Sequence, residues 1–164
     1  MTDPVFEIAR SFDAPLTLVW EMYAKEEHLR HWWGPKGFTW IASKLDFRPG
    51  GAFHYGMRAP TGQEMWGRFD YRAIEPLRRL EFTSAFCDPA GEVIRAPFAA
   101  KFPLRVLNDI RFSEADGGTT LLMTGRPFEA PDDDKEFFRA MFASMQQGFA
   151  GTLGQLEDYL RSLA

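Results

Sequence analysis

The spacing of apolar residues begins with the two-residue period of a strand and then changes to the spacing of helices. From Phe6 to Phe12, apolar side chains recur at every second position with one exception, which predicts a strand with one buried face. Apolar residues then recur three and four positions apart over residues 16–23, and a second short helix is expected over residues 26–32. Gly34-Pro35 should end that second helix.

From residue 38 to residue 128, short alternating runs are separated by Gly, Pro and Asp, a pattern typical of an antiparallel meander. One longer break, Glu92–Pro103, contains two prolines and predicts an irregular edge or loop beside the mouth of a pocket. The alternation predicts six strands with the approximate ranges Phe38–Asp46, Ala52–Ala59, Glu64–Ile74, Arg79–Cys87, Leu104–Ser113 and Thr119–Phe128.

The last segment has the pattern of one long amphipathic helix after Pro131. Its first residues, Asp132–Asp134, place negative charge where a helix N-terminus favours it. Three acids also suggest a metal site, but consecutive helical residues point in different directions, which favours the first interpretation. Gly148, Gly151 and Gly154 weaken the helix. Close packing of the helix against the sheet is the expected reason, and space for a ligand or a kink is the alternative.

Composition adds that the interior is unusually aromatic. The chain of 164 residues is 45% hydrophobic and contains 16 Phe, 5 Trp and 7 Met, which suits one domain over residues 1–164 with a deep core or a cavity. A net charge of −4 without a basic cluster excludes nucleic-acid binding, and no segment is apolar enough for membrane insertion. A cytoplasmic location is expected, and the lone Cys87 fits a reducing compartment.

Strand alternation predicts which side chains face the concave, apolar side of the sheet. Polar residues carried inward, such as Asn108, are either satisfied by the protein or by water, or they orient a carbonyl, hydroxyl or carboxylate of a ligand. The predicted ligand-binding residues are Arg10, Phe53, Tyr55, Met57, Met65, Phe69, Tyr71, Asn108, Ile110, Met141, Met145 and Phe149.

The sequence offers little for catalysis, and we expect no cofactor, no metal and no catalytic residue. His28 and His31 have a helical spacing, but no third ligand has a recognisable spacing, so packing or solvent-facing roles are favoured. No serine or cysteine nucleophile motif lies near a histidine. Trp32-Trp33 is expected to anchor the short helices to the sheet, with gating of the cavity as the alternative.

A series of short motifs, in a fixed order along residues 6–163, resembles a known family. They are Phe12-Asp13-Ala14-Pro15, Trp32-Trp33-Gly34-Pro35, Asp46-Phe47-Arg48-Pro49-Gly50-Gly51, Gly67-Arg68-Phe69, Glu75-Pro76, Phe82-Thr83, Gly118-Thr119 and Gly148 within an apolar helix. Together they resemble the START/birch-pollen-allergen-like (SRPBCC) superfamily, in the branch named after the activator of heat-shock-protein-90 ATPase. The chain departs from that branch at Phe149, where a tryptophan is usual, and in the Glu92–Pro103 segment.

The resemblance implies an α+β helix-grip fold, in which a curved seven-stranded antiparallel sheet wraps around a long C-terminal helix and two short helices follow the first strand. For function it implies binding of a small hydrophobic or amphipathic molecule between sheet and helix. Two alternatives stay open: a cyclase-like or hydrolase-like enzyme acting on a polyketide-like substrate in the same pocket, and a chaperone-cofactor or protein-interaction domain. The candidate protein partners are therefore a second copy of the chain, as a homodimer, and a chaperone.

Overall fold

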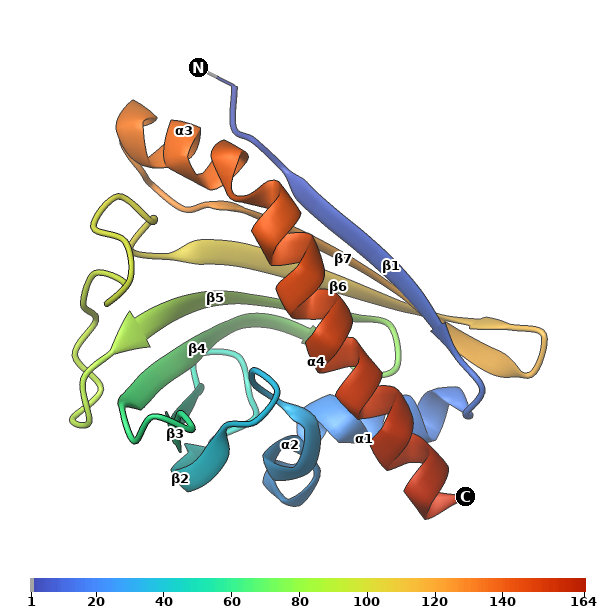
Figure 1. Cartoon of the computed structure of the whole chain (residues 1–164). Helices are drawn as coiled ribbons and strands as arrows, with labels where there is room; N and C mark the ends of the chain where they lie inside the picture. Colours follow the sequence, from blue (N-terminus) through green and yellow to red (C-terminus); the bar gives the residue numbers. More distant parts are fainter. Residues whose placement is uncertain (1) are drawn as a thin grey trace.

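A computed structural model describes residues 2–164 and contains seven strands and four helices. Two short helices follow the first strand, and two further helices end the chain (Figure 1). In chain order, the elements are β1 (Phe6–Phe12), α1 (Leu16–Ala24), α2 (Glu26–Trp32), β2 (Thr39–Leu45), β3 (Ala52–Arg58), β4 (Glu64–Glu75), β5 (Arg79–Cys87), β6 (Val106–Ala115), β7 (Gly118–Pro127), α3 (Asp132–Ala140) and α4 (Phe142–Leu163).

All seven strands form one antiparallel sheet in the order β1-β7-β6-β5-β4-β3-β2. Strands β2 to β7 are a simple meander, and β1 joins the end of it by pairing with β7. The sheet curves around α4, which crosses its concave side, while α1 and α2 lie at one end (Figure 1). This arrangement confirms the predicted fold class.

Strand boundaries agree with the sequence pattern except around the hairpin between β6 and β7. We expected a break over residues 115–118, but Ala115 pairs with Gly118, so both strands continue to the turn. Only Asp116 and Gly117 form the loop, with φ values of +50° and +79°. Two positive φ angles are the signature of a type I′ turn, whose twist matches that of the strands and favours Asp-Gly.

The end of the core beneath α1 and α2 is filled by aromatic rings. The Trp20 ring lies 5.0 Å from Phe112, and the Tyr23 ring lies 4.9 Å from Trp32 between centroids. Trp32 is 1% exposed, and its indole N–H donates to the carbonyl of Met22 at 3.1 Å. Trp32 therefore anchors α2 to α1, whereas the prediction was that it anchors the short helices to the sheet.

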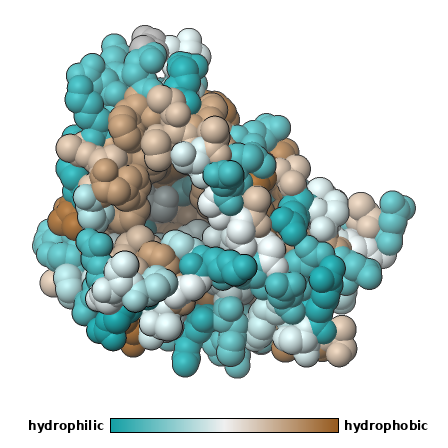
Figure 2. Space-filling view, in the orientation of Figure 1, coloured by the Kyte–Doolittle hydropathy of each residue, from teal (hydrophilic) through white to brown (hydrophobic). Residues whose placement is uncertain are grey.

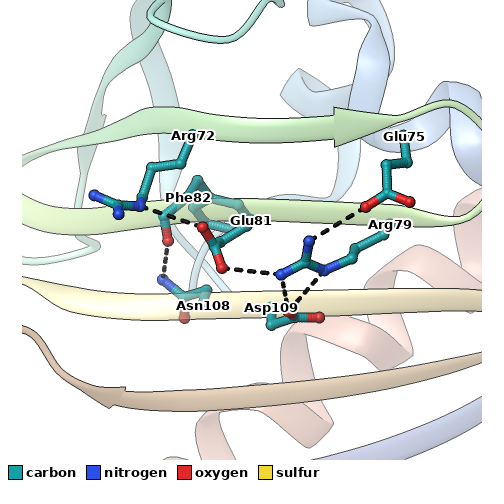
Figure 3. A network of polar contacts seen from close by, with 7 residues as sticks. All are labelled: Arg72, Glu75, Arg79, Glu81, Phe82, Asn108 and Asp109. Carbon is teal, nitrogen blue, oxygen red and sulfur yellow. Dashed lines mark hydrogen bonds and ion pairs between the residues drawn. The ribbon is translucent and has the colours of Figure 1, made fainter.

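The convex side of the sheet carries charges where the alternation predicts polar residues. Arg79 contacts three carboxylates: Asp109 at 2.7 Å, Glu81 at 2.9 Å and Glu75 at 3.2 Å (Figure 3). Hydrogen bonds to Asp109 and then to Glu75 raise the pKa of Arg79 above its ordinary value. Because the neighbouring residues Leu80 and Asn108 are buried on the opposite side, charge and cavity lie on different faces of the same strands.

The segment after Pro131 forms two helices, so the prediction of one long helix was wrong. Helix α3 ends at Ala140, and Met141 has φ −90° and ψ 0°, with its N–H directed at the carbonyl of Phe138. Phe138 is fully buried and its ring packs 5.6 Å from that of Phe142. The break therefore lies where α3 is held by Phe138, and it changes the direction of the chain before α4 crosses the sheet.

Candidate ligand cavity

A cavity of about 540 Å³ lies between the concave face of the sheet and the first half of α4. The molecule is hollowed at this place, and hydrophobic residues surround much of the opening (Figure 2). The volume is within the range of sites that enclose small molecules, which is about 300–1,000 Å³.

The sheet supplies an apolar and mainly aromatic wall to this cavity. The rings of Phe69 and Phe82, from β4 and β5, are stacked with their centroids 4.4 Å apart. Tyr55 and Met57 from β3 lie beside them, and Tyr55 is 8% exposed. These positions face inward because they share one phase of the alternation, as the sequence predicted.

Two glycines of α4 face open space, so the expected close packing of the glycines against the sheet was wrong for them. A Cβ atom built on Gly148 or Gly151 would meet no atom of residues 2–164 within 4 Å, and both residues line the cavity. On Gly154, a Cβ atom would only reach Arg10 Nη2, at 4.0 Å. Gly148 and Gly151 are exposed and leave bare helix backbone at the edge of the cavity, and the alternative of space for a ligand stays a prediction.

The segment of residues 92–103 borders the cavity opening and is irregular, as predicted. Its only pairings among the described residues are two isolated bridges, one of which joins Val93 to Cys87. Phe98 is 61% exposed, and its ring packs 5.4 Å from Phe86 and 5.8 Å from Phe102. All three phenylalanines line the cavity, so the segment contributes an aromatic rim.

Ion pairs attach this rim to the start of α3. Arg95 Nη1 lies 2.7 Å from Asp134 Oδ2, and the Asp134 side chain is only 7% exposed. Lys101 and Asp133 form a longer pair of 3.4 Å, in which both side chains are exposed. Two of the three acids after Pro131 thus fix the rim, and within residues 2–164 no group of three or more His, Cys, Asp or Glu side chains could hold a metal ion.

The opposite rim is the turn after α2, which two side chains of α4 hold in place. Thr152 Oγ1 donates to the carbonyl of Gly34 at 3.1 Å, and Gln155 Nε2 donates to the same carbonyl at 2.7 Å. Trp33 of this turn lines the cavity, with its ring 5.1 Å from Phe69. Trp33 therefore belongs to the cavity wall, unlike its neighbour Trp32, which joins α2 to α1.

Most of the predicted ligand-binding residues lie together in the cavity wall. Arg10, Phe53 and Tyr71 face inward but do not line the cavity. Contact with a ligand stays a prediction for the residues that line it, which are Tyr55, Met57, Met65, Phe69, Asn108, Ile110, Met141, Met145 and Phe149.

The three exceptions have partners of their own. Arg10 Nη2 lies 2.6 Å from Glu157 Oε2, so the guanidinium joins β1 to α4. Phe53 is 0% exposed beneath stacked rings of Tyr55 and Trp40. Tyr71 packs at 5.1 Å against Phe47, away from the open end. Alternation gives the face of the sheet on which a residue lies, but it does not say where along that face the cavity begins.

Several lining residues were absent from the sequence-based set although a signal existed for some of them. Ser84 and Phe86 continue the inward row of Phe82, and Gly125 continues the inward row of Met123, at two-residue intervals. Trp33, Phe98 and Phe102 lie in irregular segments, where no period indicates a direction.

The cavity wall contains few groups that titrate. Of the described residues that line it, none is Asp, Glu, His or Cys, and Lys36 at the edge is the one with a formal charge. Burial raises the pKa of Tyr55 to about 12, an effect that the nearby Trp33 partly offsets, and burial also raises the pKa of Tyr23. Both phenols are therefore neutral at physiological pH, and no pair of acid and base converges on the cavity.

The histidines and the cysteine lie outside the cavity and have packing partners. His28 Nδ1 lies 2.7 Å from the hydroxyl of Tyr159, and the His31 ring stacks on Tyr159 at 4.7 Å. The His54 ring lies 5.3 Å from Trp66. Burial raises the pKa of Cys87 to about 11, which keeps this thiol protonated and unreactive.

Comparison with known families gives a match over nearly the whole chain. The model of a family described as activator of Hsp90 ATPase homolog 1-like protein matches residues 13–161. None of the curated proteins compared with the chain matches it. Within residues 2–164, no helix is both long and apolar enough to cross a bilayer.

Solved structures of bacterial proteins share the fold. A protein from Mycobacterium smegmatis is 23% identical, with a TM-score of 0.76 over 98% of this chain and 96% of that one. A protein from Staphylococcus epidermidis is 22% identical, with a TM-score of 0.78 over 100% and 93%. An AHSA1 protein from Silicibacter pomeroyi is 20% identical, with a TM-score of 0.71 over 98% and 100%. At this level of identity the likeness concerns the fold.

Proposed function

Because the chain belongs to the family of activator of Hsp90 ATPase homolog 1-like proteins, we propose that it uses the helix-grip cavity to bind a small, mainly apolar molecule. The observation that supports this proposal most directly is the bare stretch of α4 at Gly148 and Gly151. A helix glycine lowers stability by up to about 1 kcal/mol relative to alanine. Two glycines that face open space have no packing reason, whereas a ligand against the backbone supplies one.

The character of the wall supports binding rather than chemistry. Catalysis of cyclisation or hydrolysis requires a group that moves a proton or attacks the substrate. The lining residues that the structure describes supply neutral phenols, two amides, hydroxyls and thioethers instead, with a single lysine at the edge. Such a wall suits burial of apolar surface, with orientation by a few hydrogen bonds.

Native mass spectrometry of the purified protein, followed by denaturing extraction, tests the proposal. We expect an added mass that is released on denaturation and is small enough for a cavity of about 540 Å³. The matched control is the filled variant, Gly148→Leu/Gly151→Leu, in which two larger side chains are introduced beside the cavity at positions where a Cβ atom meets no neighbouring group. An equal added mass on the native protein and on the filled variant would place the ligand elsewhere and contradict the proposal.

A protein that purifies without a ligand is tested by titration with Nile red, a neutral apolar dye whose fluorescence rises in apolar surroundings. We expect saturable binding to the native protein and a loss of at least about tenfold in affinity for the filled variant. Failure of the native protein to bind either an endogenous molecule or the dye would refute the proposed function.

A further inference from the structure

The cavity wall contains a buried asparagine, Asn108, whose hydrogen bonds restrict the chemistry of the ligand. Asn108 lies on β6, between β5 and β7, and is 6% exposed. Its neighbours on the same face of β6, Val106 and Ile110, are apolar and also line the cavity. A polar side chain in such surroundings is the feature that can distinguish one apolar ligand from another.

The nitrogen of the Asn108 amide is fully used by the protein. Nδ2 lies 2.9 Å from Ser84 Oγ, 3.1 Å from the Val106 carbonyl and 3.4 Å from the Phe82 carbonyl. The bond to Phe82 crosses from β6 to β5 (Figure 3). Because carbonyl oxygens only accept hydrogen bonds, the atom that faces two of them must be the nitrogen. Its two hydrogens are therefore already engaged.

The oxygen of the same amide remains available. Asn108 Oδ1 accepts no hydrogen bond from any group within residues 2–164, and it is not among the unpartnered atoms that are sealed from solvent. On this side the amide faces β7 at Gly125, which pairs with Asn108 and also lines the cavity. A Cβ atom on Gly125 would lie 3.5 Å from Oδ1, so a glycine keeps the space beside the acceptor open.

The charges around the cavity exclude a buried anion. Arg10, which faces inward on β1, is paired with Glu157, and Lys36 lies exposed at the edge. A carboxylate placed beside Asn108 would meet the lone pairs of Oδ1 and no positive charge. A ligand carbonyl has the same conflict with Oδ1. A hydroxyl can donate to Oδ1, and Ser84, whose hydroxyl hydrogen is engaged by none of the described groups, can donate in turn.

We propose that the ligand is an uncharged, mainly apolar alcohol or phenol, bound with its hydroxyl against Asn108 Oδ1. This inference rests on the proposed function, since it names the class of molecule that the same cavity takes. Asn108 is thus a specificity-determining residue: apolar surface supplies affinity, and the free acceptor selects ligands that carry a donor.

The test is competition against Nile red, which has no O–H or N–H group and so reports binding in the cavity independently of Asn108. The competitors share one skeleton: 4-phenylphenol, its methyl ether 4-methoxybiphenyl, and biphenyl-4-carboxylate. We expect the phenol to displace the dye at a concentration about tenfold lower than the ether, and the carboxylate to be weaker than both.

Two variants assign the preference to the free oxygen. In Asn108→Leu, the phenol and the ether should become equal within about twofold, while Nile red binds as before. In Gly125→Ala, the acceptor remains but the methyl group occupies the space beside it, so the advantage of the phenol should also fall. The melting temperature of each variant shows whether it folds. If Asn108→Leu does not fold, Gly125→Ala still tests the proposal. The control is Ser113→Ala, an exposed residue of the same strand that does not line the cavity, in which the phenol stays favoured.

The outcomes separate this inference from the proposed function. Binding of Nile red with equal displacement by phenol and ether, or with the carboxylate as the best competitor, overturns the alcohol or phenol assignment and leaves the cavity as a binding site. A phenol preference that survives in Asn108→Leu also overturns it. No binding of the dye or of any biphenyl overturns the proposed function, and this inference with it.

Discussion

The two halves of α4 have opposite relations to the rest of the molecule. From residue 152 onward, Leu153, Leu156 and Leu160 are buried against α2 and the sheet. Between residues 142 and 151 no side chain is fully buried, and two glycines expose the backbone. The second half therefore holds the fully buried side chains of the helix, whereas the first half packs only partly buried side chains, such as Phe142 and Phe149, against the core and borders the cavity.

The largest difference in stability is expected when one apolar side chain is truncated in each half of α4. Leu156→Ala should lower the free energy of unfolding by about 2–5 kcal/mol, because the leucine is 0% exposed and its removal leaves an enclosed void. Met145→Ala should cost under about 1 kcal/mol, because its side chain borders a cavity that is already open. Thermal or urea unfolding measures both, and equal losses would contradict the division of α4.

A smaller effect is expected where the rim of the open half is attached. Asp134→Asn removes the charge that holds Arg95 and should lower stability by about 1 kcal/mol, since Arg95 is partly exposed. The main consequence should be local, with faster proteolysis within residues 92–103 and faster entry of Nile red. Asp133→Asn is the matched control, because its pair with Lys101 is exposed on both sides. Identical cleavage rates in the two variants would show that the Arg95 pair does not fix the rim.

One substitution in the first half of α4 should stabilise the protein instead of destabilising it. Gly151→Ala should raise the free energy of unfolding by up to about 1 kcal/mol, because alanine favours the helix and its methyl group meets no atom of residues 2–164 within 4 Å. Gly118→Ala, in the closely packed part of the sheet, should lower it, because the methyl group would collide with the carbonyl oxygen of Phe12. The melting temperatures of the two variants are compared with that of the native protein. A lower melting temperature for Gly151→Ala would mean that neighbouring atoms crowd the backbone at Gly151.

The smallest effect concerns the ion pair that joins α4 to β1. Hydrogen bonding to Arg10, and then the charge of Arg161, lower the pKa of Glu157 below its ordinary value of 4.5. Because the pKa of Glu157 is lower in the folded state, its ionised form stabilises the protein at every pH above the ordinary pKa. This contribution disappears as the pH falls through the lowered pKa of the folded state. Glu157→Gln should therefore melt slightly below the native protein near pH 7, and the gap should close in acid. A gap that widens below pH 4.5 would reverse the assignment.

The sequence predicted the sheet better than the helix that crosses it. Strands such as β1 and β5 were found at their observed bounds because one buried face imposes a two-residue period that few substitutions can hide. The helix was predicted from a period as well, but the apolar period continues through Met141, where the structure has a break, so the pattern gave no signal of two helices. The glycines of α4 were identified as unusual, but they were expected to pack against the sheet, whereas Gly148 and Gly151 face open space.

The candidate site was predictable where strands build it and unpredictable where loops do. Tyr55, Phe69 and Asn108 followed from alternation, since each lies on a regular strand with a known inward phase. Phe98 and Trp33 did not, because an irregular segment has no phase. The free oxygen of Asn108 also required coordinates, because the partners of its amide lie on three different residues, two of them on the neighbouring strand.

The double hydrogen bond from Thr152 and Gln155 to the Gly34 carbonyl has a consequence for the route of exchange. It ties the turn that carries Trp33 to the packed half of α4, so that side of the opening moves only if the helix itself moves. The other side, residues 92–103, is held by side-chain ion pairs together with the packing of Phe98 and Phe102 and two isolated bridges. If the cavity binds a molecule as proposed, that molecule should enter and leave past Phe98, and its residence time should shorten with added salt because salt weakens the ion pairs of this side.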